Sequence, residues 1–332
     1  MLAAQDVVHV HLTHPDRDNL FRIAATPSDL IKQNLKTFGV QCTQCQKTLD
    51  KLLKCSKCKG VWYCSKECQK KHWPAHKPAC HDVERSSGAL KFVRTFCANI
   101  TLMMFLKVAI IYDCGLLDNP RLGFDVPFMA RVDIAIEPTD ILDFAGLYLN
   151  KRPIAEKLEG MVQVNTVSAW DPKTHPPLTP TRLRLWQQAR AQSTAAGYGK
   201  DPVGLIEFLN YTENSTTAAF HIASSVLAAA RKREPFLCSS AVTGNRFEKP
   251  MDSATCIEYI NLHIRADEQN QLLLRTVMTE QDKEVIRAAG RNENSLSVSL
   301  LNYKMQREPL YANIINVTPI PSSDSRRVNM KV

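Results

Sequence analysis

The 332-residue chain lacks the short motifs that identify the commonest enzyme classes. It contains no G-x-S-x-G nucleophile turn, no G-x4-G-K-[ST] phosphate loop, no H-E-x-x-H zinc-protease pair and no G-x-G-x-x-G dinucleotide loop. His72 and His76 have the spacing of the zinc-protease pair, but no Glu follows His72 and Pro74 lies between the two histidines. The sequence therefore gives no motif-based reason to assign a hydrolase, a nucleotide-binding enzyme or a dehydrogenase.

The chain also lacks an uninterrupted apolar run of membrane-spanning length. Its most apolar stretch, residues 89–117, is interrupted by Asn99, Thr101 and Lys107, so we expect a core helix of a globular domain there. The first residues contain no basic region and no long apolar region of the kind that marks a secretory signal. These absences predict an intracellular protein, in the nucleus or the cytoplasm, without membrane contact.

Positive charge is only moderately in excess. The net charge is +9, and the hydrophobic content of 44% and charged content of 23% are those of an ordinary globular protein. Nine of the lysines lie between residues 42 and 80, where metal-bound thiolates would offset much of their charge. Nucleic-acid binding therefore does not follow from charge alone, and we do not expect it.

Cysteine is scarce outside one segment, because only four of the eleven cysteines lie outside residues 42–80. Within that segment the metal-ligating residue types fall into four pairs: Cys42 and Cys45, Cys55 and Cys58, Cys64 and Cys68, and His76 and Cys80. Thiolate and imidazole are ligands that select zinc, and eight of them fill two tetrahedral sites without an open position for a catalytic water. In a chain without a secretory signal, reduced thiols favour metal over disulfides. We therefore predict two structural Zn²⁺ ions per chain.

The residues between these pairs predict their local structure. Only five residues separate Cys58 from Cys64, and they contain a glycine followed by a β-prone Val-Trp-Tyr run, which is typical of a tight hairpin. Ser65 is a candidate N-cap, so we expect a short helix after it that ends at Pro74.

This segment resembles a MYND-type zinc finger. The ligand spacing, the aromatic Tyr63 before Cys64 and the run Cys68-Gln69-x3-Trp73-x2-His76-Lys77-x2-Cys80 match that family over about an eighth of the chain. The resemblance, and not the spacing alone, implies an interleaved arrangement of the ligands. On that basis Cys42, Cys45, Cys64 and Cys68 would hold one zinc, and Cys55, Cys58, His76 and Cys80 the other.

The resemblance also implies a partner, since MYND-type fingers recognise P-x-L-x-P peptides. The family's peptide-contact positions fall here on Ser56, Gln69 and Trp73. Trp73 offers a flat apolar face to a proline ring and Gln69 can pair with an extended backbone; Trp73 could instead anchor its helix to the second zinc site, and the two roles are compatible. The chain itself contains Pro176-x-Leu178-x-Pro180, a candidate ligand for its own finger or for that of a neighbouring copy.

Many MYND-bearing proteins carry a SET-type lysine methyltransferase domain, but that family's Asn-His-Ser-Cys-type cofactor signature and its post-SET cysteine cluster are absent here. Two hypotheses therefore remain. The first is a non-enzymatic adaptor or regulator that docks proline-containing peptides. The alternative is an enzyme of unrecognised type in residues 86–332, with the finger as substrate recruiter. A deep pocket with converging titratable groups would favour the alternative.

The rest of the chain predicts a mixed α+β domain. Period-2 alternation and β-prone runs indicate strands near residues 8–12, 131–137, 162–166, 203–209, 216–222 and 272–278. Capping residues and helical spacing indicate helices starting at Thr26 and spanning 224–233, 253–265 and 279–289. The expected fold class is α+β, with a small two-zinc finger embedded near the N-terminus of a larger domain. The expected division is an N-terminal strand and helix in 1–38, the finger in 39–82 and the mixed domain in 86–332.

Several other polar or reactive residues are better explained by ordinary structural roles than by chemistry. The carboxylates at the end of the strand near 131–137 fit a solvated strand end: Asp133, Glu137, Asp140 and Asp143. The isolated thiols and imidazoles of the large domain fit core positions: Cys97, Cys114, His221 and His263. The histidines near the N-terminus fit an exposed edge strand: His9, His11 and His14.

Overall fold

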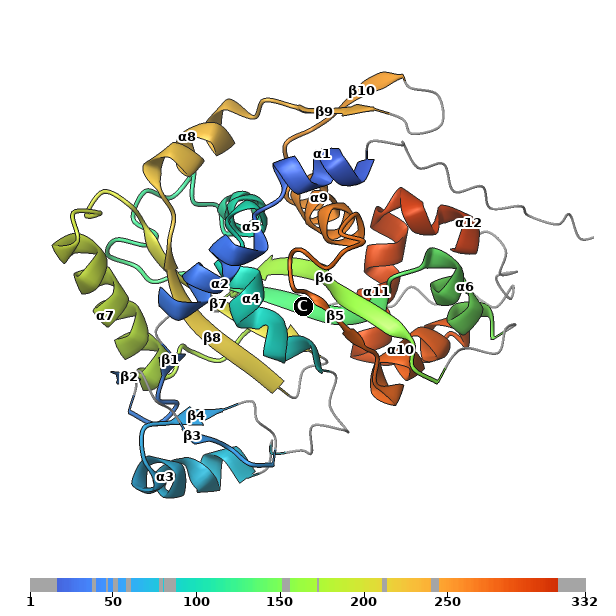
Figure 1. Cartoon of the computed structure of the whole chain (residues 1–332). Coiled ribbons are helices and arrows are strands. Elements are labelled where there is room, and N and C mark those ends of the chain that lie inside the picture. The colour runs from blue at the N-terminus through green and yellow to red at the C-terminus, as the bar shows by residue number, and fades with distance from the viewer. Residues whose placement is uncertain are drawn as a thin grey trace, which may run out of the picture.

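The computed structural model describes residues 17–37, 40–45, 47–49, 53–57, 61–77, 80, 88–150, 156–171, 173–210, 214–239 and 245–315. The strand predicted near residues 8–12, with its histidines, lies outside these ranges. The described part is a mixed α+β structure, with a small module below a larger helix-covered sheet (Figure 1). The predicted fold class is confirmed.

The larger part is built on a five-stranded sheet with the strand order β11-β6-β5-β7-β8. The strands are β5 (Met129–Pro138), β6 (Glu159–Ala169), β7 (Val203–Asn210), β8 (Asn214–His221) and β11 (Arg275–Val277). Neighbouring strands are antiparallel except for β5 and β7, which run parallel. The four strands predicted between residues 131 and 222 are confirmed, and the strand predicted at 272–278 is shorter than expected.

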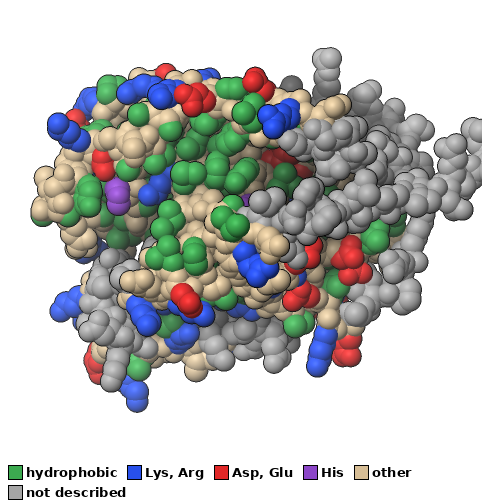
Figure 2. Space-filling view, turned by 45° about the horizontal axis from the view of Figure 1, so that its top comes forward, with side chains coloured by type: hydrophobic (Ala, Val, Ile, Leu, Met, Phe, Trp, Pro, Cys, Tyr) green, Lys and Arg blue, Asp and Glu red, His purple; other side chains and the backbone are tan. Residues whose placement is uncertain are grey.

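Helices surround this sheet, and a separate two-stranded ribbon lies outside them at the top of the view, near α1 and α8 (Figure 1). Figure 2 shows hydrophobic side chains gathered on this upper face of the molecule, with basic and acidic side chains around them. The helices outside the finger are α1 (Arg17–Ala24), α2 (Ser28–Thr37), α4 (Val93–Ala98), α5 (Ile100–Asp113), α6 (Ile141–Leu149), α7 (Pro180–Ala195), α8 (Ser224–Lys232), α9 (Ser253–Arg265), α10 (Glu280–Gly290), α11 (Leu296–Arg307) and α12 (Ala312–Ile315). Two 3-10 turns, η3 (Gly88–Phe92) and η4 (Pro309–Tyr311), and the ribbon strands β9 (Phe236–Ser239) and β10 (Arg246–Lys249) complete this part.

The helix predictions based on capping residues were accurate. Helix α9 has the predicted bounds, and α8 and α10 differ from them by one residue. Thr279 and Asp282 form a reciprocal capping box at the start of α10, in which each side chain accepts a hydrogen bond from the other residue's backbone N–H. Helices α6, α7 and α11 and the β9–β10 ribbon were not predicted.

The most apolar stretch forms two helices and not one. Asn99 ends α4 and begins α5, and its buried side chain accepts a hydrogen bond from the backbone N–H of Leu102. The two segments meet at 98°, so Ile100 and Met104, which continue the predicted apolar stripe, are exposed on α5. No single described helix is long and apolar enough to cross a membrane, although this bent pair passes the same test on combined length and composition.

Strand β5 is buried along almost its whole length, where period-2 alternation predicted one exposed face. The interpretation of Asp133 and Glu137 as solvated is therefore wrong, because both are at most 3% exposed. The strand is central in the sheet, and η3, α6 and α10 contact it, so neither of its faces reaches solvent. Asp140 lies beyond the strand and caps α6 by accepting from the N–H of Leu142.

The two helices before the finger pack on the large domain. The Thr26 hydroxyl donates to Asn99 Oδ1 at 3.0 Å, and Asn34 Nδ2 donates to the carbonyl of Ala98 at 2.9 Å. Helix α2 therefore starts at Ser28, one residue later than predicted, since Thr26 bonds across to α5 and does not begin the helix. The chain leaves the large domain after α2, forms the finger and returns at η3, which confirms an embedded finger.

Candidate metal centre

Two small hairpins and one helix build the finger. Strand β1 (Val40–Gln41) pairs with β2 (Thr48–Leu49), and β3 (Leu53–Lys54) pairs with β4 (Trp62–Tyr63). Helix α3 (Lys66–His76) follows the second hairpin directly. The backbone N–H of Cys55 donates to the carbonyl of Val61, which extends the second ladder to the first ligand of the loop. The hairpin predicted between Cys58 and Cys64 is confirmed, although Cys58 itself lies outside the described residues.

The first cluster of ligand atoms joins the loop between β1 and β2 to the start of α3. The sulfurs of Cys42, Cys45, Cys64 and Cys68 all lie within 4.8 Å of one another. Cys45 Sγ is 3.6 Å from Cys64 Sγ, and Cys64 Sγ is 3.3 Å from Cys68 Sγ. A tetrahedral zinc with Zn–S bonds of about 2.3 Å holds its sulfurs roughly 3.8 Å apart, whereas a disulfide needs about 2.05 Å. The cluster therefore has the size of a zinc site, and every described cysteine is free of disulfides.

Backbone N–H groups stabilise the thiolate form of Cys42 in this cluster. Burial alone would raise the pKa of the Cys42 thiol, but hydrogen bonds from the backbone N–H groups of Cys45, Cys64 and Gln44 lower its pKa to about 6. The thiolate is the form that binds metal. Donors that stabilise a thiolate, placed beside three further sulfurs, fit a resident Zn²⁺.

The second cluster contains Cys55, His76 and Cys80, all of them buried and with donor atoms within 4.8 Å of one another. Cys55 Sγ and Cys80 Sγ are 3.7 Å apart, again close to the spacing around a tetrahedral zinc. His72, four residues before His76 on the same helix, belongs to neither cluster. The two clusters match the two Zn²⁺ ions of a MYND finger, and the predicted pair of zinc ions is confirmed at that level.

Helix α3 carries ligands at both ends. Ser65 caps it as predicted, because Ser65 Oγ accepts a hydrogen bond from the backbone N–H of Cys68 at 3.3 Å. The prediction that Pro74 ends the helix is wrong, since α3 continues through Pro74 to His76. A proline inside a helix removes one hydrogen bond, and here His76, held against Cys55 and Cys80, keeps the last turn in place.

Aromatic side chains make three contacts in and around the module that the sequence did not predict. The Tyr63 hydroxyl, on a fully buried side chain, is 2.9 Å from His72 Nδ1, and His72 is half-buried. Lys54 lies 4.2 Å above the ring of Trp62, and Arg94 of α4 approaches the same ring at 6.0 Å. Trp62 thus touches both the finger and the large domain.

The predicted peptide-contact residues differ in exposure. Ser56 is exposed and Gln69 is half-buried. Trp73 is 40% exposed, and its ring meets that of His76 edge to face at 5.8 Å between centroids. Trp73 therefore packs against a metal ligand and still presents part of its ring to solvent.

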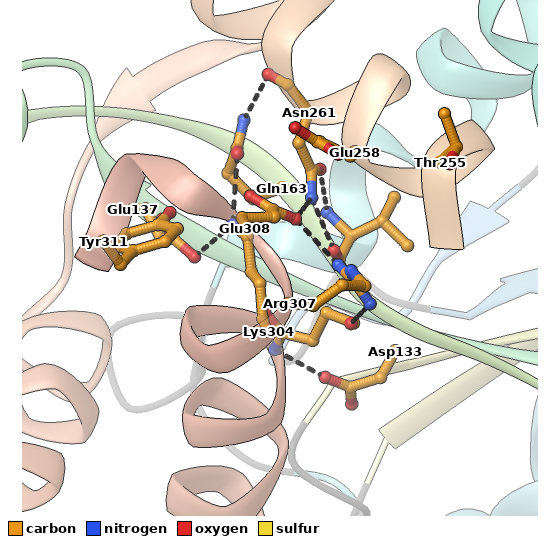
Figure 3. Close-up of polar contacts among 12 residues, drawn as sticks. Asp133, Glu137, Gln163, Thr255, Glu258, Asn261, Lys304, Arg307, Glu308 and Tyr311 are labelled. Carbon is orange, nitrogen blue, oxygen red and sulfur yellow. Dashed lines mark hydrogen bonds and ion pairs between the residues drawn. The ribbon is translucent and has the colours of Figure 1, made fainter. Parts of the chain in front are cut away.

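The large domain holds a buried polar network that the sequence did not reveal (Figure 3). Glu137 accepts hydrogen bonds from Lys304 Nζ at 2.5 Å, Tyr311 Oη at 2.5 Å and Arg265 Nη2 at 3.1 Å. Burial would raise the pKa of Glu137, but the charges of Lys304 and Arg265 outweigh it and hold the pKa below its usual value. Figure 3 shows Glu137, Lys304 and Tyr311 converging from β5, α11 and η4, where the lysine and the tyrosine both bond to the glutamate.

Two cavities lie near this network; one is small, and the other is lined by charged side chains that are bonded to each other. One of about 10 Å³ beside Glu137 and Asn165 has room for about one water molecule. A wider hollow of about 470 Å³ runs along α11 and η4, and its charged residues Arg307 and Glu308 are bonded to each other at 2.7 Å. Neither hollow supplies free titratable groups for the alternative hypothesis of an enzyme.

The remaining candidates of the large domain belong to no metal cluster within the described residues. Cys97 and Cys114 are half-buried and pack against the core, where burial raises the pKa of their thiols to about 12. His263 is buried between the rings of Phe21 and Tyr259, as predicted. His221 is exposed, so its interpretation as a core residue is wrong.

Comparison with known proteins separates the finger from the large domain. The family described as MYND finger matches residues 42–80, and the family described as Domain of unknown function (DUF8205) matches residues 86–311. A MYND finger is a known protein-interaction zinc module.

Curated relatives match short segments of this chain. Human histone-lysine N-methyltransferase SMYD3 is 50% identical over 42 residues, which is 13% of this chain and 10% of that protein. The SET domain-containing protein 14 of Caenorhabditis elegans is 34% identical over 90 residues, which is 25% of this chain and 19% of that protein. The chain thus spans a tenth to a fifth of the length of these relatives. No solved structure matches it. With about two thirds of its length matched, the chain belongs to the family described as Domain of unknown function (DUF8205), and it carries a MYND finger ahead of the matched region.

Proposed function

We propose that the protein is an adaptor whose finger docks proline-containing peptides of other proteins, with Ser56, Gln69 and Trp73 as the contact residues. The supporting observation is the partly exposed ring of Trp73 on a helix fixed by metal ligands. The full ligand sets of the proposal are Cys42, Cys45, Cys64 and Cys68 for one zinc, and Cys55, Cys58, His76 and Cys80 for the other.

Helical spacing supports a shared contact surface. Gln69 and Trp73 are four residues apart on α3, so their side chains lie on the same face. A proline ring packs well on a flat indole, and the Gln69 amide can both donate to and accept from an extended peptide backbone. Such a peptide loses little entropy on binding because its proline residues already hold it extended.

The metal clusters would give this surface its rigidity. The buried apolar cluster of the finger consists of ligand cysteines and Tyr63, with Val61 packed beside it. So small a core cannot hold a surface in place by itself, and structural zinc supplies the folding free energy in modules of this kind.

The chain's own Pro176–Pro180 segment is a weaker ligand candidate. Pro180 is the first residue of α7, with Thr179 as its N-cap. Leu178 packs, partly buried, against the cluster that contains Leu185 and Trp186. The segment would have to leave this packing to reach a finger, so we propose partners in other proteins instead.

Fluorescence anisotropy with a labelled P-x-L-x-P peptide and the full-length protein tests the proposal. We expect Trp73→Ala to remove binding and Trp73→Phe to retain part of it, while both variants keep about two zinc ions per chain. Tyr198→Ala, which truncates an exposed aromatic of the large domain, is the matched control and should bind as the wild type does. Undiminished binding by Trp73→Ala with intact zinc would exclude the proposed surface.

A further inference from the structure

The face of α3 that carries Trp73 is lined with lysines. At 3.6 residues per turn, Lys66, Lys70 and Lys77 project within about 60° of Trp73 around the helix axis. All three are exposed, and Gln69 lies on the other side of Trp73. Lys71 projects about 160° away from Trp73, on the opposite face of the same helix.

These lysines have no carboxylate partner within ion-pair distance among the described residues. The surface of α10 is different, because Arg287 pairs with Glu280 and Glu284 on the same helix. The one acid of α3, Glu67, lies in its first turn, where the Ser65 hydroxyl and, more weakly, the charges of Lys70 and Lys66 lower the pKa of its carboxyl. One carboxylate balances one of these ammonium groups at most. Helix α3 therefore presents unbalanced positive charge around its exposed aromatic ring.

The metal ligands reduce this charge without cancelling it. Residues 42–80 contain nine lysines and two carboxylates. Seven thiolates around two Zn²⁺ ions contribute a net charge of −3, which leaves the module at about +4. In the first cluster Cys42 is buried, Cys64 and Cys68 are half-buried and Cys45 is exposed, so part of the negative charge of that site lies at the surface. The lysines of α3 are exposed as well, and they outnumber this charge.

We infer that the finger selects peptides that carry acidic residues beside their proline segment. This inference rests on the proposed docking function. A peptide lying across Trp73 and Gln69 passes Lys66 and Lys70 toward one end of the helix and Lys77 toward the other. Aspartate or glutamate flanking the proline core would meet these ammonium groups at the rim of the contact. Rim charges of this kind steer association and add specificity, and salt screens them.

A protein segment fits this face better than a nucleic acid. Single-stranded nucleic acids bind through successive aromatic platforms along a basic groove. On this face of α3 the exposed ring is that of Trp73 alone, and its neighbour Gln69 suits a peptide backbone. We therefore assign acidic protein segments as the partner class.

Three labelled peptides with the same P-x-L-x-P core and flanks of glutamate, glutamine or lysine test this inference on the full-length protein. We expect the glutamate-flanked peptide to bind about tenfold more tightly than the glutamine-flanked one at low salt, and the advantage to shrink as salt rises. The lysine-flanked peptide should bind most weakly. Equal binding of all three would overturn the acidic preference and leave peptide docking intact, whereas no binding of any would overturn the docking function as well.

Two adjacent substitutions locate the charge effect. Lys70→Glu reverses a charge beside Trp73, and Lys71→Glu makes the same change on the opposite face. We expect the first to lose most of the preference for glutamate flanks and the second to keep it, with zinc content unchanged in both. Equal effects would show that only overall charge matters and would overturn the assignment to this face. Competition by a single-stranded oligonucleotide at lower concentration than the peptide would favour nucleic acid and overturn the partner class.

Discussion

The ammonium nitrogen of Lys304 lies 2.5 Å from a carboxylate oxygen of Glu137, and neither side chain is more than 1% exposed. Lys304 comes from α11, near the end of the described chain, and Glu137 from the central strand β5. Arg265 of α9 and Tyr311 of η4 bond to the same carboxylate. These three bonds to Glu137 therefore connect α9, α11 and η4 to the central strand of the sheet.

Removing one member of this pair should lower the stability of the protein. Lys304→Met leaves the carboxylate of Glu137 buried with Arg265 and Tyr311 as its remaining partners, and we expect a loss of about 3–5 kcal/mol in the free energy of unfolding. Urea denaturation measures the loss. The matched control is Lys232→Met, whose pair with Glu234 is exposed, and it should cost at most about 1 kcal/mol. Equal costs for the two variants would contradict a structural role for the buried pair.

Asp133 should make the stability of the protein depend on pH near neutrality. Burial raises the pKa of its carboxyl to about 7 from an ordinary 3.8, against the lowering effect of the hydrogen bond from Asn165. Between these two values the folded protein binds a proton that the unfolded chain releases, so this residue destabilises the fold as pH rises from about 4 to 7.

Asp133→Asn removes that titration and can still accept the hydrogen bond from Asn165. We therefore expect the variant to gain stability over the wild type progressively between pH 4 and 7 and to hold the gain above pH 7. The gain is at most about 4 kcal/mol. Urea denaturation at a series of pH values measures it, and parallel stability curves for the two proteins would rule out a titrating Asp133.

The sequence predicted the finger in detail because its determinants are local. Spacing and ligand chemistry identify the ligand pairs, and the resemblance to MYND-type fingers implies how the pairs combine into clusters. Ser65 caps α3 as expected, and the β3–β4 hairpin lies where the short loop requires it. Pro74 was the exception among these local rules. His76 lies in the second cluster, and this contact keeps the chain helical after Pro74. The residues next to Pro74 do not reveal such a tertiary contact.

The large domain was less predictable because its polar interactions join residues far apart in sequence. Glu137 and Lys304 are 167 positions apart, so nothing near Glu137 indicated that a buried cation would neutralise it. The general tendency of carboxylates to be exposed then gave the wrong interpretation. Helices α8, α9 and α10 were found, whereas α6 and α11 were not, although Asp140 and Ser295 cap their first turns.

Removal of zinc should unfold the finger and leave the large domain folded. The ligands and Tyr63 make up the buried part of the finger, so the metal-free module has almost no core of its own. A strong chelator should release about two zinc ions per chain, and amide hydrogen exchange should then rise in α3 and the β3–β4 hairpin while it stays low in β5 and β6. Added zinc should restore protection. Loss of protection across the sheet, or no released zinc, would contradict this division.

Gly290, the last residue of α10, lies directly against the backbone of Tyr148 in α6. A Cβ built at this position would lie 1.7 Å from the carbonyl oxygen of Tyr148, which belongs to backbone and cannot rotate away. Gly290→Ala must therefore separate the two helices, and we expect a loss of about 3 kcal/mol or more in the free energy of unfolding. Gly199→Ala is the matched control, because its nearest neighbour is 3.7 Å away, and it should change stability by no more than about 1 kcal/mol. Thermal unfolding of both variants measures the difference, and a stable Gly290→Ala protein would mean that α10 and α6 lie farther apart than the structure places them.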